Sequence, residues 1–151
     1  MSLSNENKGS LDEHTVEITL PNKLGYERIA MGSVAAFAKG IGFLPSRIED
    51  LKTAVAEACI NAVQHGNKDR PNARVIVSMD FKDGALNVSV FDEGDGFARE
   101  TKDPDIARIM ENLDPPIGFG TFLMKRLMDQ VVYRKLGDHR HEVRMTMKLG
   151  D

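Results

Sequence analysis

A helical pattern between residues 46 and 67 constrains the fold more than any other part of the chain. Apolar residues recur there at helical spacing, so this stripe is predicted to face a core. A second stripe, made of Glu57, Asn61 and His65, advances four residues at a time and lies roughly 100° to one side. A polar stripe beside an apolar one is usually only the boundary between core and solvent. It indicates a functional site only if other motifs support it.

The ends of this helix carry their own signals. Ser46 followed by Glu49 has the form of a capping box, which predicts the start of the helix. Gly66 and Asn67 predict its end. Cys59 is the single cysteine, cannot form an internal disulfide, and is predicted to be a small buried hydrophobe in a protein of a reducing compartment.

Other segments alternate between strand-like and helix-like patterns, which predicts an α+β fold in the form of a two-layer α/β sandwich. A short link at 82–84 predicts a hairpin. Residues 92–120 lose all periodicity, which is typical of a functional loop, and we interpret 97–117 as a lid. Strands are expected over residues 14–20, 74–81, 85–91, 131–135 and 142–149, with further helices over 24–43 and 119–130.

Composition limits the classes of function. The chain has 151 residues and a net charge of -3, which suits one domain and gives no basic field for direct binding of nucleic acid. No apolar run reaches the ~18 residues of a membrane span. Residues 1–12 are polar and are expected to be a disordered lead or an expression remnant before a single domain over 13–151. We therefore expect a cytoplasmic protein.

Two glycine motifs accompany the polar stripe. Asp92 leaves a predicted strand and is followed by Gly94 and Gly96, whereas Gly118 and Gly120 open a predicted helix. Either motif alone is weak, because glycine is common in turns. Glycine at a helix N-terminus nevertheless leaves free N–H groups at the positive end of the helix dipole, an arrangement that suits phosphate.

The stripe and the two glycine motifs together describe a nucleotide site. Asn61 can complete the oxygen coordination of Mg²⁺, and Glu57 can serve as a base. Asp92, at the end of a strand, can accept a hydrogen bond from an exocyclic amine. The site would then have a base end, a metal and a phosphate end.

These motifs resemble, in order, the N, G1 and G2 boxes of the Bergerat-fold (GHKL, histidine-kinase-like) ATPases. The chain is most similar to the stand-alone serine kinases that act as anti-sigma factors in bacterial partner-switching systems. The matching segments are EACINAVQHGN at 57–67, VFDEGDGF at 90–97 and GFGTFLMKRLMDQVVY at 118–133. The resemblance spans roughly residues 14–149 and implies a Bergerat fold with a mixed, mostly antiparallel sheet.

The resemblance also implies a role for each matching residue. Asn61 would hold Mg²⁺ against the phosphates of ATP, Glu57 would be the catalytic general base, and Asp92 would accept from the adenine amine. Many relatives have Gly or Leu where this chain has Thr121, and for His65 a structural role competes with ligand contact. The implied nucleotide-binding positions are Asn61, His65, Gly66, Asp92, Gly94, Gly96, Gly118, Gly120 and Thr121.

The resemblance implies an ATP-dependent protein serine/threonine kinase for transcription regulation in a stress response. Its substrate would be an anti-sigma factor antagonist of the STAS type, a sigma factor would be a second partner, and relatives often form homodimers. Two other readings stay open: a nucleotide-binding anti-sigma or regulatory module without phosphotransfer, and a histidine-kinase catalytic domain. His139 and His141 flank Arg140 near a predicted hairpin, but no third metal ligand is evident.

Overall fold

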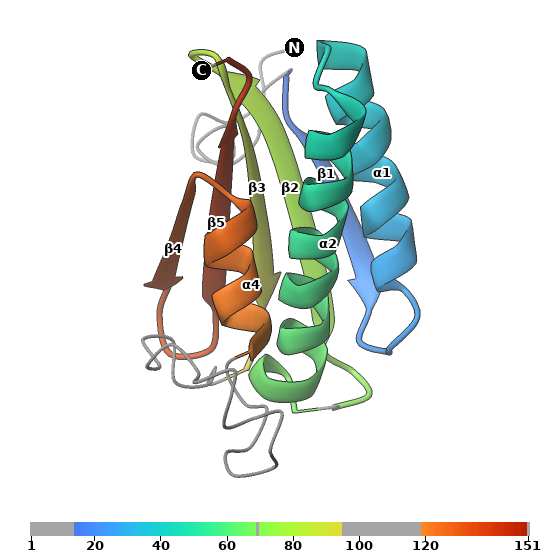
Figure 1. Cartoon of the computed structure of the whole chain (residues 1–151). Coiled ribbons are helices and arrows are strands. Elements are labelled where there is room, and N and C mark those ends of the chain that lie inside the picture. Colours follow the sequence, from blue (N-terminus) through green and yellow to red (C-terminus); the bar gives the residue numbers. More distant parts are fainter. Residues whose placement is uncertain (1–13, 69, 95–118, 151) are drawn as a thin grey trace, which may run out of the picture.

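A computed structural model describes residues 14–68, 70–94 and 119–150, and it confirms the two-layer α+β architecture (Figure 1). One layer is a five-stranded sheet, and the other consists of helices packed on one face of that sheet. The elements in chain order are β1 (Val16–Pro21), α1 (Glu27–Ile41), α2 (Pro45–Asn61), the π-helical turn η2 (Ala62–Gly66), β2 (Arg74–Lys82), β3 (Ala85–Asp92), α4 (Phe119–Leu127), β4 (Gln130–Lys135) and β5 (His141–Lys148).

The strands lie in the order β1-β2-β3-β5-β4, and each neighbouring pair in the described sheet is antiparallel. The family resemblance implies a mixed, mostly antiparallel sheet, and the mixed character is wrong for the strands described. Antiparallel neighbours need no crossover between them, and β2 and β3 meet through a short hairpin. Asp83 and Gly84 both have positive φ there, 54° and 77°, as a two-residue hairpin turn of this kind requires.

The core lies between the sheet and the helices. Side chains alternate along each strand, so one residue in two faces the helices. Val77 pairs with Val90, and Val90 pairs with Val143, which gives a continuous apolar row across three strands. From the helix layer, Leu51 and Val55 are fully buried against this face, as the apolar stripe of α2 predicted. Packing of this kind contributes most of the stability of the fold.

Cys59 is buried on α2, as the sequence predicted. Burial, with a smaller contribution from the Glu27 carboxylate, raises the pKa of the Cys59 thiol to about 12. The thiol is therefore neutral at physiological pH and is a packing group rather than a nucleophile.

The start of α2 differs from the prediction. The helix begins at Pro45, with Leu44 as its N-cap residue and no side-chain cap, so Ser46 and Glu49 do not form the expected capping box. Proline suits the first helical position because its φ is preset and its missing N–H would have no partner there. Pro45 therefore starts the helix one residue before Ser46.

The end of α2 also departs from a regular α-helix. After Asn61 the chain widens into η2, and the N–H of Asn67 donates to the carbonyl of Ala62, five residues back, at 2.7 Å. The helix stops at Gly66 and Asn67 as predicted, but the π-turn changes the angle per residue. His65 therefore does not continue the Glu57–Asn61 stripe in α-helical register.

The first and last helices are shorter than expected. Helix α1 ends before Gly42, whose φ of 115° closes the helix as its N–H donates to the Ala38 carbonyl at 3.0 Å. Helix α4 ends at Leu127, and the N–H of Asp129 already donates to the Thr146 carbonyl of β5. Among the helices described, none is both long enough and apolar enough to cross a membrane.

Candidate nucleotide-binding site

The first turn of α4 lies directly against the polar edge of α2. A Cβ atom added at Gly120 would overlap Oε2 of Glu57 and would lie 3.3 Å from Cδ of Glu57 and 3.7 Å from Nδ2 of Asn61. Glycine at position 120 thus leaves room for the Glu57 carboxylate against the first turn of α4. The structure brings together Glu57, Asn61 and the N-terminal turn of α4, whose first N–H groups have no partners within the helix.

Glu57 is half-buried in this position. Burial raises the pKa of its carboxyl group above the ordinary value, because the charged form loses hydration. A carboxylate with a raised pKa is a stronger proton acceptor, and a general base works best when its pKa approaches the working pH. The environment of Glu57 therefore favours the role that the sequence assigned to it.

Asp92 ends β3 at the other side of the site and is only 3% exposed. The N–H of Gly94 donates to its Oδ1 at 3.1 Å. A Cβ atom at Gly66 would overlap the Asp92 carboxylate, and one at Gly94 would overlap the Gly66 carbonyl. Three predicted site residues therefore meet at the end of η2, and glycine is required at two of them.

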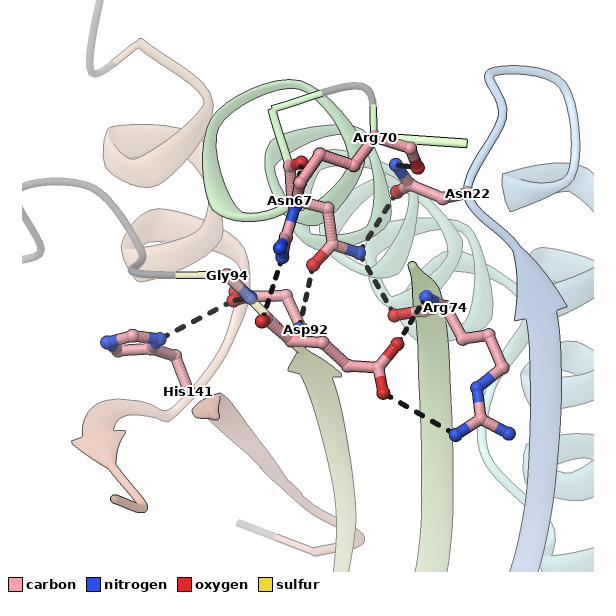
Figure 2. Close-up of polar contacts among 8 residues, drawn as sticks. Asn22, Asn67, Arg70, Arg74, Asp92, Gly94 and His141 are labelled. Atoms are coloured by element: carbon pink, nitrogen blue, oxygen red, sulfur yellow. Dashed lines mark hydrogen bonds and ion pairs between the residues drawn. The ribbon is translucent and has the colours of Figure 1, made fainter. Parts of the chain in front are cut away.

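A buried asparagine that the sequence predicted only as the end of a helix holds this end of the site together (Figure 2). Asn67 is fully buried, and its Nδ2 donates to Oδ1 of Asn22 and to the carbonyl of Arg74, both at 3.0 Å. Its Oδ1 accepts from the N–H of Glu93 at 2.7 Å. One side chain thus ties the end of η2 to three other parts of the chain, including the residue after Asp92.

Arg70 and Glu93 add a second set of bonds around Asn67 (Figure 2). The guanidinium of Arg70 donates to the carbonyls of Asn67 and Glu93, at 3.1 and 2.9 Å. The carboxylate of Glu93 accepts from the backbone N–H of Arg74 at 2.6 Å. The segment after η2 and the segment after β3 are therefore fixed to each other through both side chains and backbone.

His141 is the second residue that the sequence analysis did not place here. It is the register partner of Asp92 on β5, so both side chains lie on the helix-facing side of the sheet. Its Nδ1 lies 3.5 Å from Oδ1 of Asp92, and both side chains are buried (Figure 2). The sequence suggested His141 only as a weak metal candidate, and the part of the chain that the structure describes contains no cluster of three His, Cys, Asp or Glu suited to a metal.

Residues 20–147 match the family of histidine kinase-like ATPase domains. The chain belongs to this family. Within curated proteins it is similar to the serine-protein kinase RsbW of Bacillus subtilis, with 36% identity over 77% of this chain and 75% of the relative. It is also similar to the serine-protein kinase RsbW of Listeria innocua, with 33% identity over 77% of this chain and 76% of the relative.

Two solved structures share the fold of this histidine kinase-like ATPase domain. The RsbU and RsbW domains of a Mycobacterium tuberculosis protein match with a TM-score of 0.65 and 21% identity, over 89% of this chain and 32% of that one. The SiaB–SiaC complex of Pseudomonas aeruginosa matches with a TM-score of 0.61 and 10% identity, over 94% and 95% of the two chains. Its curated relatives are serine-protein kinases and match this chain over most of its length. The chain is therefore an ATP-dependent serine/threonine-protein kinase.

The donor set of this ATPase domain fits a magnesium ion bound together with nucleotide. Glu57 presents a carboxylate oxygen beside the first turn of α4, and the side-chain amide of Asn61 lies next to it and carries a second hard oxygen, Oδ1. Mg²⁺ in nucleotide sites is usually held by one or two protein oxygens, with phosphates and water supplying the other ligands. A site whose described residues supply only one or two such oxygens therefore suits a cation that arrives with ATP.

The remaining predicted site residues differ in where they lie in the structure. Thr121 is 3% exposed in the first turn of α4, adjacent to Gly120. His65 is exposed on η2, and its contact with a ligand remains a prediction. Gly96, Gly118 and the expected lid at 97–117 lie outside the described residues, as does the expected disordered lead at 1–12.

Proposed function

We propose that this kinase binds ATP with Mg²⁺ and phosphorylates a Ser or Thr of an anti-sigma factor antagonist of the STAS type. In a partner-switching system the same protein would act as an anti-sigma factor, with a sigma factor as its second partner, in the cytoplasm. The observation that carries the proposal is the packing of Gly120 against Glu57 and Asn61. It supports a phosphate-binding helix end beside a base and a magnesium ligand.

Each group would have one task in the transfer. The hydroxyl oxygen of the substrate attacks the γ-phosphorus of ATP, and its proton passes to a carboxylate oxygen of Glu57. The bond between the γ-phosphorus and the bridging oxygen breaks, and ADP leaves. Asn61 would hold the magnesium ion, which when bound offsets the negative charge of the phosphates. The N–H groups at the start of α4 would orient the phosphoryl group.

Asp92 would hold the opposite end of the nucleotide. Its carboxylate accepts a hydrogen bond from the 6-amine of adenine, whereas it repels the 6-oxo group of guanine. Gly66 and Gly94 support this assignment, because they let the backbone lie against the carboxylate and fix its position. The kinase is therefore expected to prefer ATP over GTP.

The magnesium assignment is tested by replacing Asn61 with alanine. Because Asn61 acts through the metal, Asn61→Ala should weaken binding of Mg–ATP and abolish phosphotransfer. The half-exposed position implies little loss of fold. Calorimetric titration with ATP, with and without Mg²⁺, checks this. Equal affinity of parent and variant for Mg–ATP would show that Asn61 is not the metal ligand.

The substrate class is tested by incubating the parent with ATP, Mg²⁺ and candidate antagonist proteins, followed by phosphosite mapping. The proposal predicts phosphate on one Ser or Thr of a STAS-type protein, transferred on the order of 10²–10⁴ times more slowly when Glu57→Gln replaces the parent. If the parent binds nucleotide and a sigma factor yet phosphorylates no antagonist, the protein is a regulatory binding module and the transfer proposal is wrong.

A further inference from the structure

The C-terminal end of α4, remote from Gly120, is tied to two other elements through one carboxylate. Asp129 follows α4 by two residues and directly precedes β4. Its Oδ2 accepts from Nη2 of Arg47, in the first turn of α2, at 3.1 Å and from the backbone N–H of Lys148, on β5, at 2.7 Å. Its own N–H donates to the Thr146 carbonyl at 2.9 Å. The end of α4 is therefore joined to β5 by two hydrogen bonds and to α2 by an ion pair.

The two attachments of α4 to α2 are spaced alike along antiparallel segments that lie side by side (Figure 1). Gly120 meets Glu57 at one end, and Asp129 meets Arg47 at the other. Arg47 and Glu57 are ten positions apart in α2, and Gly120 and Asp129 are nine positions apart. At ~1.5 Å per residue, the two spacings are ~15 and ~14 Å. A slide of α4 along α2 would therefore break the ion pair and shift the first turn of α4 past Glu57 at the same time.

The ion pair is better suited to positioning than to stabilising the fold. The side chains of Arg47 and Asp129 are 34% and 38% exposed, and ion pairs at such exposure contribute little to stability. Met124 and Met128 are buried and anchor α4 in the core. Burial of apolar side chains is non-directional, whereas a hydrogen-bonded ion pair has a preferred geometry. The pair therefore adds a constraint along the helix axis that the apolar packing lacks.

We propose that Arg47 and Asp129 are positioning residues, whose ion pair fixes α4 along α2 and hence the phosphate-binding turn relative to Glu57. The inference rests on the proposed function, since it takes the first turn of α4 to bind the phosphates of ATP. It also gives a role to the part of the segment 118–133 that lies farthest from the two glycines. Neither residue needs to touch the nucleotide for this role.

The experiment separates phosphate binding from adenine binding. Dissociation constants for Mg–ATP are measured by calorimetry and those for adenosine by NMR titration, which reaches weak binding. The proteins are the parent, Arg47→Ala, Arg47→Lys, Asp129→Asn and the double variant of Arg47→Ala with Asp129→Asn. Asparagine at 129 keeps an oxygen that can accept from the Lys148 N–H and loses the charge. Lys52→Ala is the matched control, because Lys52 pairs with Glu49 of the same helix at 3.2 Å.

In Arg47→Ala and Asp129→Asn, affinity for Mg–ATP should fall about fivefold, the upper end of the contribution of an exposed ion pair. Affinity for adenosine should stay at the parental value, because Asp92 is unchanged. The double variant should lose no more than either single variant, since both act through one contact. Arg47→Lys should recover part of the loss, and Lys52→Ala should bind both ligands as the parent does. A purely structural role would leave the ratio of the two affinities unchanged in folded protein.

An unchanged ratio of Mg–ATP to adenosine affinity in folded Arg47→Ala and Asp129→Asn overturns the inference, as do losses that add in the double variant. Phosphotransfer by the parent would then leave the proposed function standing. A reduced ratio in a protein whose parent transfers no phosphate supports the inference and contradicts the transfer. A parent that binds Mg–ATP no better than adenosine contradicts the phosphate-binding turn, and both proposals fail.

Discussion

At the scale of single residues, the missing side chain at position 120 determines where the Glu57 carboxylate can lie. A methyl group at 120 would meet the far end of Glu57, a flexible side chain that can rotate away, rather than backbone. Gly120→Ala should therefore displace the carboxylate without unfolding the protein. Since misplacing a reacting group by ~1 Å can reduce a rate on the order of 100-fold, phosphotransfer should fall by about that factor.

Helix α1 offers the matched control for this substitution. Gly32 is also helical, but nothing lies within 4 Å of a Cβ atom added there. Gly32→Ala should raise the free energy of unfolding by ~0.5–1 kcal/mol, the usual helix gain, and leave phosphotransfer unchanged. Denaturant unfolding and a transfer assay on both variants check this. If Gly120→Ala transfers as fast as Gly32→Ala, the position of Glu57 is not set by Gly120.

The raised pKa of Glu57 predicts the pH dependence of the reaction. The base acts only when deprotonated, so transfer should fall as the pH drops through the pKa of Glu57. Because burial raises that pKa, the fall should lie at higher pH than for an ordinary glutamate. Single-turnover rates across acidic pH provide the measurement. Glu57→Gln removes this one titrating group and keeps all others, so the residual transfer rate of the variant should not fall in this pH range. If the rates of parent and variant fall together, another group causes the pH dependence.

The residues of the site were predictable from the sequence to different degrees. Glu57 and Asn61 share one helix, and the structure places Gly120 beside them as the G2-box resemblance implied. The roles of His141 and Asn67 were missed because they depend on contacts between distant segments. Asp92 meets His141 only because β5 pairs with β3, and no local pattern in the sequence gives the register of two separated strands.

At the scale of elements, the junction of η2 with β2 and β3 depends on one amide. Asn67→Ala would leave the Arg74 carbonyl and the Glu93 N–H without their buried partner. Each such group costs ~1–3 kcal/mol, so the free energy of unfolding should fall by about 3 kcal/mol. Adenine affinity should fall as well, because Glu93 follows Asp92 directly. Denaturant unfolding and nucleotide titration measure the two effects.

Asn72 provides the control for the junction, since it is exposed in the loop that follows. Asn72→Ala should alter stability by no more than ~0.5 kcal/mol, as for most surface substitutions. Asn67→Asp keeps the acceptor for Glu93, but it turns an oxygen toward the acceptors on Asn22 and Arg74 and buries a charge, so it should lower stability at least as much as Asn67→Ala. A small effect of Asn67→Ala, equal to that of Asn72→Ala, would contradict a structural role for this amide.

Most elements followed from periodicity, and the exceptions have local causes. Alternation located the strands to within about two residues, because one face of each strand is buried. The capping-box prediction at Ser46 was wrong because Pro45 supplies a preset first helical residue. The π-turn at Ala62–Gly66 ends where Gly66 lies against Asp92, a contact between distant segments that the periodicity of the sequence does not predict.

At the scale of the whole molecule, the two layers place the site at one end of the helix–sheet interface. Helices α2 and α4 lie side by side on the same face of the sheet, and the end of β3, paired with the start of β5, meets η2 there (Figure 1). The layered architecture was predictable from composition and periodicity. The fully antiparallel strand order was not, because pairing is decided by contacts between segments far apart in the sequence.

The central claim is that this geometry supports phosphotransfer rather than nucleotide binding alone, and Glu57→Gln tests it most directly. Glutamine has almost the same size as glutamate but cannot take up the proton. On one pair of proteins, nucleotide dissociation constant, partner association and transfer rate to an antagonist are measured together. We predict unchanged nucleotide affinity and partner association, with transfer reduced by on the order of 10²–10⁴. Transfer at the parental rate in Glu57→Gln would contradict the account.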